Sequence, residues 1–168
     1  MKKLLLVATM VLGMSGMSLA QQYNTATNSA NLQLQVLAAM QMSVGGSLDF
    51  GMVPQGVAAT PTIAVGSGAT FDVSGTDSAS FEITLPTSTV LTNISDASTI
   101  SFTPVLKCSA DGTTAGNAAA DNTPYMLGVP SSPNAGHYYF LLGGSVNVTT
   151  STTAGVYKGT YTLTATYN

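Results

Sequence analysis

Few side chains in this sequence could carry acid–base or nucleophilic chemistry. Its 168 residues contain one histidine, His137, one cysteine, Cys108, and seven aspartate and glutamate residues. His137 follows Pro133-Asn134-Ala135-Gly136, a stretch that predicts a turn, and no G-x-S-x-G motif supplies a serine nucleophile. We therefore expect His137 to be a surface-loop histidine and the protein not to be an enzyme.

The carboxylates do not suggest a catalytic pair or a metal site. Asp72 and Asp77 are near in sequence, but nothing beside them would make one an acid and the other a nucleophile, as glycoside hydrolysis requires. Residues 110–123 hold oxygen ligands without the spacing of a calcium loop, namely Asp111, Asn117, Asp121 and Asn122. One His and one Cys leave no usual zinc set. We expect no metal, no cofactor and no small-molecule substrate, and an exposed loop at 110–123.

Cysteine and tyrosine have structural interpretations that we prefer to chemical ones. Cys108 shares one face of a predicted strand with Phe102 and Leu106, which favours a buried, inert thiol over a reactive one. Four tyrosines could form a platform for stacking sugars, but on strands such rings more often pack in the core or pair across strands; they are Tyr138, Tyr139, Tyr157 and Tyr161. The charge balance is equally restrictive, because four lysines, no arginine and a pI near 4.5 exclude a nucleic-acid binder.

Residues 1–20 are typical of a secretory signal peptide. Lys2 and Lys3 precede an apolar stretch from Leu4 to Met17, and Ser18-Leu19-Ala20 is a small-x-small cleavage site. No cysteine follows to carry a lipid anchor, and no second long apolar run follows to span a membrane. We expect an exported protein that passes through the periplasm to the cell surface or the medium.

The remaining chain predicts a single all-β domain. Gly, Pro and Asn punctuate it every eight to twelve residues, and no amphipathic run at helical spacing occurs. This pattern is typical of an immunoglobulin-like antiparallel β-sandwich of about eight or nine short strands. Besides the first run, period-2 alternation predicts strands at 47–51, 62–65, 70–73, 80–85, 99–108, 138–142, 145–149 and 156–167.

The first alternating run, residues 32–44, is too long for one ordinary strand. Two interpretations stay open. In one, residues 21–37 are an extension whose alternating Leu32, Leu34 and Val36 form a donor strand for another molecule, and the domain covers 38–168. In the other, the whole run is the domain's own first strand and residues 21–30 are a leader, so that the sandwich is complete.

The C-terminal strand is the most informative segment. One face carries Tyr157, Gly159, Tyr161, Leu163, Ala165 and Tyr167, and the other carries Lys158 and four threonines. Such a strand is either covered by its own domain or open to a strand from elsewhere. If it is open, the sandwich lacks its last strand.

Two resemblances bear on this choice. Leu48-Asp49-Phe50-Gly51, the segment 143–148 and the segment 155–168 resemble a family of exported bacterial domains of unknown function that are regarded as fimbria-like. The tail is also similar to that of chaperone–usher pilins, with a penultimate tyrosine, Tyr167, and a glycine fourteen residues from the end, Gly155. Many pilins have a disulfide in their first strands, which Cys108 alone cannot form.

The pilin resemblance implies a structural function. Such subunits are incomplete immunoglobulin-like sandwiches whose groove is filled first by a strand of a periplasmic chaperone and then, in the fibre, by the N-terminal segment of the next subunit. The resemblance thus implies a chaperone and an outer-membrane usher as partners. We therefore expect a homopolymeric surface filament subunit that accepts a strand along Gly155, Tyr157, Tyr161, Leu163, Ala165 and Tyr167. The alternative is a monomeric secreted β-sandwich that binds a glycan or a host protein through its loops.

Overall fold

Ten strands make up the fold. The structure is a computed structural model that describes residues 30–87 and 89–168. The predicted signal peptide at 1–20 and residues 21–29 of the predicted extension lie outside the described residues. The strands are β1 (Gln41–Gly45), β2 (Thr62–Ile63), β3 (Ala69–Ser74), β4 (Ser80–Thr84), β5 (Val90–Asn93), β6 (Thr99–Ser109), β7 (Pro124–Met126), β8 (His137–Val146), β9 (Tyr157–Lys158) and β10 (Thr164–Tyr167). No helix occurs in the described ranges, and so none there could cross a membrane.

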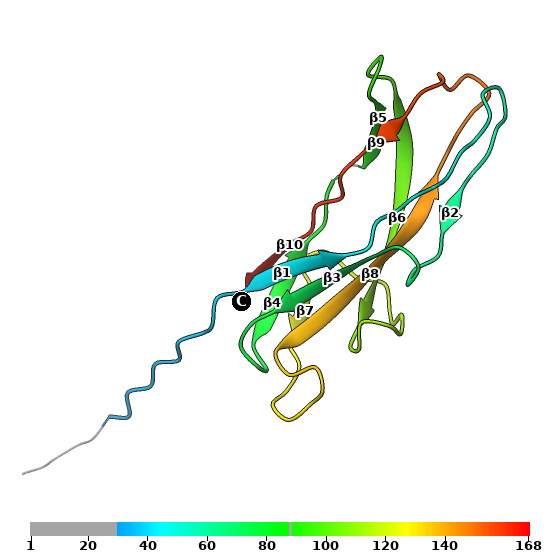
Figure 1. The fold of residues 1–168 in the computed structure, drawn as a ribbon. Coiled ribbons are helices and arrows are strands. Elements are labelled where there is room, and N and C mark those ends of the chain that lie inside the picture. The colour runs from blue at the N-terminus through cyan, green and yellow to red at the C-terminus, as the bar shows by residue number, and fades with distance from the viewer. Residues whose placement is uncertain (1–29, 88) are drawn as a thin grey trace, which may run out of the picture. The chain divides into compact units, whose positions relative to one another are not determined.

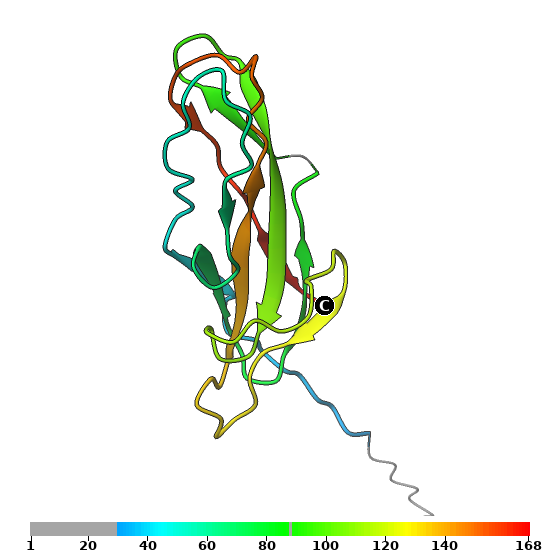
Figure 2. The same ribbon diagram turned by 90° about the vertical axis from the view of Figure 1, so that its right-hand side faces the viewer.

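Two antiparallel sheets form a β-sandwich, which confirms the predicted fold class. The larger sheet has the strand order β1-β3-β8-β6-β5-β9. Strand β2 also pairs with β8, at its C-terminal end. The smaller sheet has the order β10-β4-β7. The long strands β6 and β8 run beside each other along most of the domain (Figures 1 and 2).

The core lies between the inward faces of these sheets. Strand β3 alternates buried and half-buried residues, as the period-2 pattern of 70–73 predicts. Its buried side chains Phe71 and Val73 pack with side chains of β4 and β8, including Phe81 and Phe140, whose rings are 6.3 Å apart. Edge-to-face and tilted contacts of this kind add to the stability from apolar burial.

Several predicted strand boundaries were wrong. Residues 138–149, predicted as two strands, form the single strand β8 through Val146, because Gly143 and Gly144 stay in the ladder opposite β6. Strands β5 and β7 were not predicted. His137, predicted in a surface loop, is instead the first residue of β8, where its Nδ1 lies 2.8 Å from Asp72 Oδ1 on β3.

The long first run does not form one strand. Only its end, Gln41–Gly45, pairs with β3 as β1. The chain divides into units 1–35 and 36–168, and the second contains all ten strands. In the first unit, residues 30–35 are described, and they are exposed and outside any strand. The boundary at residue 38 between extension and domain stays a prediction.

The ends of the sandwich are here named the base and the tip. The base consists of the β3–β4 turn, 75–79, and the loop 128–136, which are joined by a hydrogen bond from Gly75 N to the Gly136 carbonyl. The tip consists of the loops 52–57, 94–98 and 149–155. The loop 128–136 and the loops around β5 and β9 lie at opposite ends of the domain in both views (Figures 1 and 2).

Candidate functional site

The C-terminal segment Gly155–Tyr167, called the tail below, crosses from one sheet to the other. Near the tip, β9 pairs with β5 in the larger sheet, and near the base, β10 pairs with β4 in the smaller sheet. Each is the last strand in its sheet order, so in the described part of the chain one edge of the tail has no strand partner. The predicted single strand 156–167 is therefore two short strands with one open edge.

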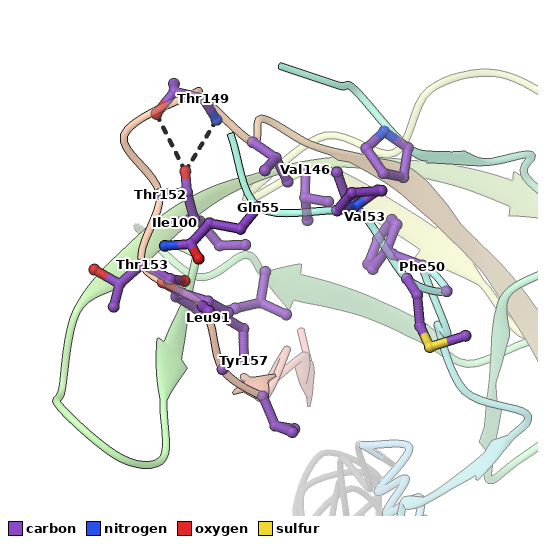
Figure 3. A pocket seen from close by; sticks show the side chains of 18 of the residues that line it. Phe50, Val53, Gln55, Leu91, Ile100, Val146, Thr149, Thr152, Thr153 and Tyr157 are labelled. Atoms are coloured by element: carbon purple, nitrogen blue, oxygen red, sulfur yellow. Dashed lines mark hydrogen bonds between the residues drawn. The ribbon is translucent and has the colours of Figure 1, made fainter. Parts of the chain in front are cut away.

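Two cavities lie between the tail and the segment that follows β1. One has a volume of about 400 Å³ and is bordered by Val44, Phe71 and Tyr161. The other, of about 610 Å³, extends to the tip loops at Val53, Thr152 and Tyr157 (Figure 3). Three residues border both cavities, namely Leu48, Phe50 and Leu91. The two cavities are therefore neighbours, and together they are called the groove below.

Aromatic rings form the floor of the smaller cavity. The Phe102 ring lies 5.7 Å from that of Phe50 and 6.5 Å from that of Tyr161, and Tyr161 also contacts Phe71 at 6.1 Å. Burial raises the pKa of the Tyr161 hydroxyl above its ordinary value. This part of the groove is therefore an apolar surface suited to aliphatic side chains.

Val44 shows that the groove lacks a cover. Its position in β1 opposite Phe71 places it on the same face as Met42, which lies opposite Val73 and packs against the core. Met42 is half-buried as expected, but Val44 is 58% exposed. Val44 is therefore an inward-facing apolar residue that the described part of the chain leaves open to solvent.

The predicted strand-acceptor residues divide into two groups. Gly155, Tyr157 and Tyr161 border the groove. Leu163 is already buried in the core, and Ala165 and Tyr167 pack partly against it. The open part of the tail is therefore its half nearer the tip.

Gly155 has a steric reason to be glycine. Its φ of +154° is a backbone conformation that residues with a side chain rarely adopt. A Cβ atom at this position would lie 2.4 Å from the Asn93 side-chain nitrogen. Asn93 is buried, accepts a hydrogen bond from Ser95 N and donates one to the Ala154 carbonyl. Gly155 thus lets the tail cross directly over a buried asparagine at the end of β5.

Tyr167 holds the end of the tail at the base. Its hydroxyl accepts a hydrogen bond from Thr76 N at 2.9 Å and donates one to the Ala38 carbonyl at 3.0 Å. Ala38 N in turn donates to Thr76 Oγ1. The chain therefore enters the domain beside the end of the tail, where β1 and β10 lie close together (Figure 1).

The predicted donor residues are all exposed. Leu32 is 98% exposed and Leu34 is 88% exposed, and Val36 also has little contact with its surroundings. Polar residues alternate with them at Gln33 and Gln35. An alternating apolar segment exposed in this way buries its side chains only if it joins another surface.

The polar groups elsewhere have local partners. Asp111 accepts hydrogen bonds from Thr113 N and Thr114 N, which lower the pKa of its carboxyl well below the ordinary range. It thereby orders the loop that was predicted at 110–123.

Among the described residues, no group of three His, Cys, Asp or Glu side chains could hold a metal ion. Cys108 is half-buried and packs against the core.

Sequence reasoning missed one wall of the groove. Leu91 lies on β5, which the alternation pattern did not predict, because Thr92 and Asn93 follow it in place of further apolar residues. Leu48 and Phe50 alternate about Asp49, as strand residues do, but the structure assigns no strand there. Their apolar spacing was the available signal for this wall.

The comparison with known proteins places the sandwich in a family. No curated protein matches the chain. The family described as "Domain of unknown function (DUF4402)" matches residues 50–167, which include the tail and the part of the groove from Phe50 onward. The chain therefore belongs to the DUF4402 family of domains of unknown function.

Proposed function

We propose that this protein is the structural subunit of a bacterial surface filament, in which the extension of one copy adds as a β-strand to the groove of another. The observation that carries the proposal is the uncovered groove beside the open edge of the tail, marked by the exposed, inward-facing Val44. The exposed alternation of Leu32, Leu34 and Val36 supplies a matching strand.

The energetics of this exchange are favourable. Each large apolar side chain transferred from water to the groove contributes about 1.5–3 kcal/mol. Each backbone hydrogen bond to the open edge of the tail adds about 0.5–1.5 kcal/mol. Three such side chains and a short ladder therefore contribute on the order of 10 kcal/mol, before the cost of ordering the extension is subtracted.

The resemblance to fimbria-like domains and to pilin tails supports the same proposal. Gly155 and Tyr167 hold the positions of the pilin glycine and penultimate tyrosine, and each has a defined place at one end of the tail. A subunit with an open groove exposes apolar surface, so a periplasmic chaperone and an outer-membrane usher are the partners we expect. The signal-like residues 1–20 agree with export to the cell surface.

The first test compares material sheared from producing cells on a denaturing gel, run unheated and boiled. Strand-exchanged subunits dissociate slowly, so we expect an unheated ladder that collapses to one band on boiling. Leu34→Asp should abolish the ladder, whereas Gln33→Asp, one residue away on the other face, should retain it. Val44→Asp should act like Leu34→Asp, with Gln41→Asp as its control, since Gln41 is exposed on the other face of β1 and lies opposite Ser74.

These positions separate assembly from folding. Leu34 and Val44 are exposed, so the charged variants should unfold at the same denaturant concentration as the parent monomer. A single monomer band for the parent protein in both lanes contradicts the proposal. It would favour the alternative of a monomeric secreted module that binds a glycan or a host protein.

A further inference from the structure

We infer that the tip of each copy rests on the base of the next through an apolar contact, in addition to the exchanged strand. The inference rests on the proposed function. It concerns which ends of two sandwiches meet, and it follows from where the chain enters the domain and from where the groove opens.

The entry point is fixed at the base. Ala38 is held by hydrogen bonds to Thr76 in the β3–β4 turn and to Tyr167 at the end of the tail. The groove extends in the opposite direction, from Val44 toward the tip loops at Thr152. An extension that leaves one base must therefore lie in the groove of a neighbour in one of two directions.

Only one direction stacks the sandwiches end to end, without two neighbours crowded at one base. If the extension ran from the tip to the base of its acceptor, parallel to the tail, its own domain would begin beside the acceptor's base. Each base would then hold two neighbours, and the tips would stay free. If the extension runs from base to tip, antiparallel to the tail, its own domain begins beyond the acceptor's tip. This arrangement repeats without limit in one direction, so the structure assigns the antiparallel direction.

The linker is too short to keep the two domains apart. In the antiparallel direction, Val36 is the donor residue nearest the acceptor's tip, and only Leu37 separates it from the fixed Ala38. Because an extended chain spans at most about 3.3–3.6 Å per residue, the gap cannot exceed roughly two residues of backbone. The tip of the acceptor must therefore lie against the base of the donor.

Both surfaces suit such a contact. At the tip, Met52 is 99% exposed and Ile94 is 64% exposed, and Ile94 N is bonded to the Val156 carbonyl at the mouth of the groove. At the base, the loop 128–136 has no charged residue and exposes Val129, so the apolar contact is assigned to this loop and not to the neighbouring turn 75–79, which carries Asp77. Exposed apolar residues at the two ends that the linker brings together are expected to bury one another.

The test uses cysteine pairs and a short bismaleimide cross-linker on assembled protein. Cys108→Ser is made first, to leave only the introduced thiols. Ile94→Cys combined with Val129→Cys should give a ladder that persists after boiling, and so should Met52→Cys combined with Val129→Cys. Each single-cysteine variant should collapse to monomer, because a tip then faces a base without a partner thiol.

Each outcome decides a different point. Boiling-resistant dimers from Val129→Cys alone would show base-to-base contact and overturn the inference. A heat-sensitive ladder without cross-linking in either double variant would also overturn it, while leaving strand exchange intact. If the protein with no introduced cysteine forms no heat-sensitive ladder, the proposed function itself fails. Each introduced position is exposed, and denaturant unfolding of the monomers checks that the variants fold.

Discussion

The Tyr167 hydroxyl lies 3.0 Å from the Ala38 carbonyl oxygen and joins residues 129 positions apart in the sequence. The same hydroxyl accepts a hydrogen bond from Thr76 N. One phenol thus holds three segments at the base of the sandwich, namely the entry of the chain, the β3–β4 turn and the end of the tail. In the proposed filament, a force that the neighbouring subunit exerts on the extension would reach the domain at Ala38, which these hydrogen bonds hold.

Tyr167→Phe should destabilise the domain without altering its groove. Phenylalanine retains the ring but loses both hydrogen bonds, and we expect the free energy of unfolding to fall by about 1–2 kcal/mol. Denaturant unfolding of the monomer measures the effect. Tyr161→Phe is the control, since the Tyr161 hydroxyl has no hydrogen-bond partner among the described residues, and it should change the stability little. Equal effects of the two substitutions would contradict the assigned role of Tyr167.

Gly155→Ala should destabilise the crossing of the tail over β5. The added methyl group meets the Asn93 side chain, and φ is unfavourable, so we expect a loss of about 1–3 kcal/mol, as in other overpacked sites. Gly45→Ala is the matched control, because nothing lies within 4 Å of a Cβ atom there. Thermal unfolding of both variants should show a lowered midpoint only for Gly155→Ala.

The sequence predicted the fold where the alternation is regular and both faces are clear. In β3 and β4, Phe71, Val73, Phe81 and Ile83 alternate with polar residues, and all four are buried as expected. The predictions failed where a strand is short or changes partner. The tail alternates without a break, but it leaves one sheet and joins the other between Lys158 and Thr164, a tertiary event that local periodicity cannot show.

Local periodicity could likewise indicate only part of the candidate site. The alternation of the tail places Tyr157 and Tyr161 on one face of a strand, and in the structure each borders one of the two cavities. It could not show that Leu163 is covered by β4 and its neighbours whereas Val44 is not, because burial depends on which strands meet across the sandwich. Whether a residue on an inward face is covered or exposed is visible only in the structure.

Acid should loosen the loop 110–119. Hydrogen bonds from Thr114 N and Thr113 N lower the pKa of the Asp111 carboxyl, so the folded loop favours the ionised form. The resulting stabilisation is present above the ordinary aspartate pKa, near 3.9, and is lost as pH falls below it toward the lowered value. The protection factors of the amides in this loop, which compare the exchange rates with those of an unstructured peptide at the same pH, should fall in acid for the parent protein. Asp111→Ala should give the lowered protection already at neutral pH, whereas Asp77→Asn, in the β3–β4 turn, should behave as the parent.

Alkaline titration of Tyr161 should report whether the groove is filled. Burial raises the pKa of this tyrosine, so the folded monomer holds its proton more tightly than the unfolded chain. The stabilisation is therefore present below the ordinary tyrosine pKa, near 10, and is lost as pH rises through the higher folded value. A strand laid over Tyr161 removes more water from it, so its ionisation in the polymer should occur at a still higher pH.

The ultraviolet absorbance of tyrosinate measures this difference, when the titration of Tyr161→Phe is subtracted from that of the parent protein. The same subtraction with Tyr139→Phe is the control, because Tyr139 lies on β8 and borders neither cavity. We expect an upward shift of the Tyr161 midpoint on assembly and none for Tyr139. An unchanged Tyr161 midpoint in a protein that does polymerise would mean that copies join elsewhere and that the groove stays open to water.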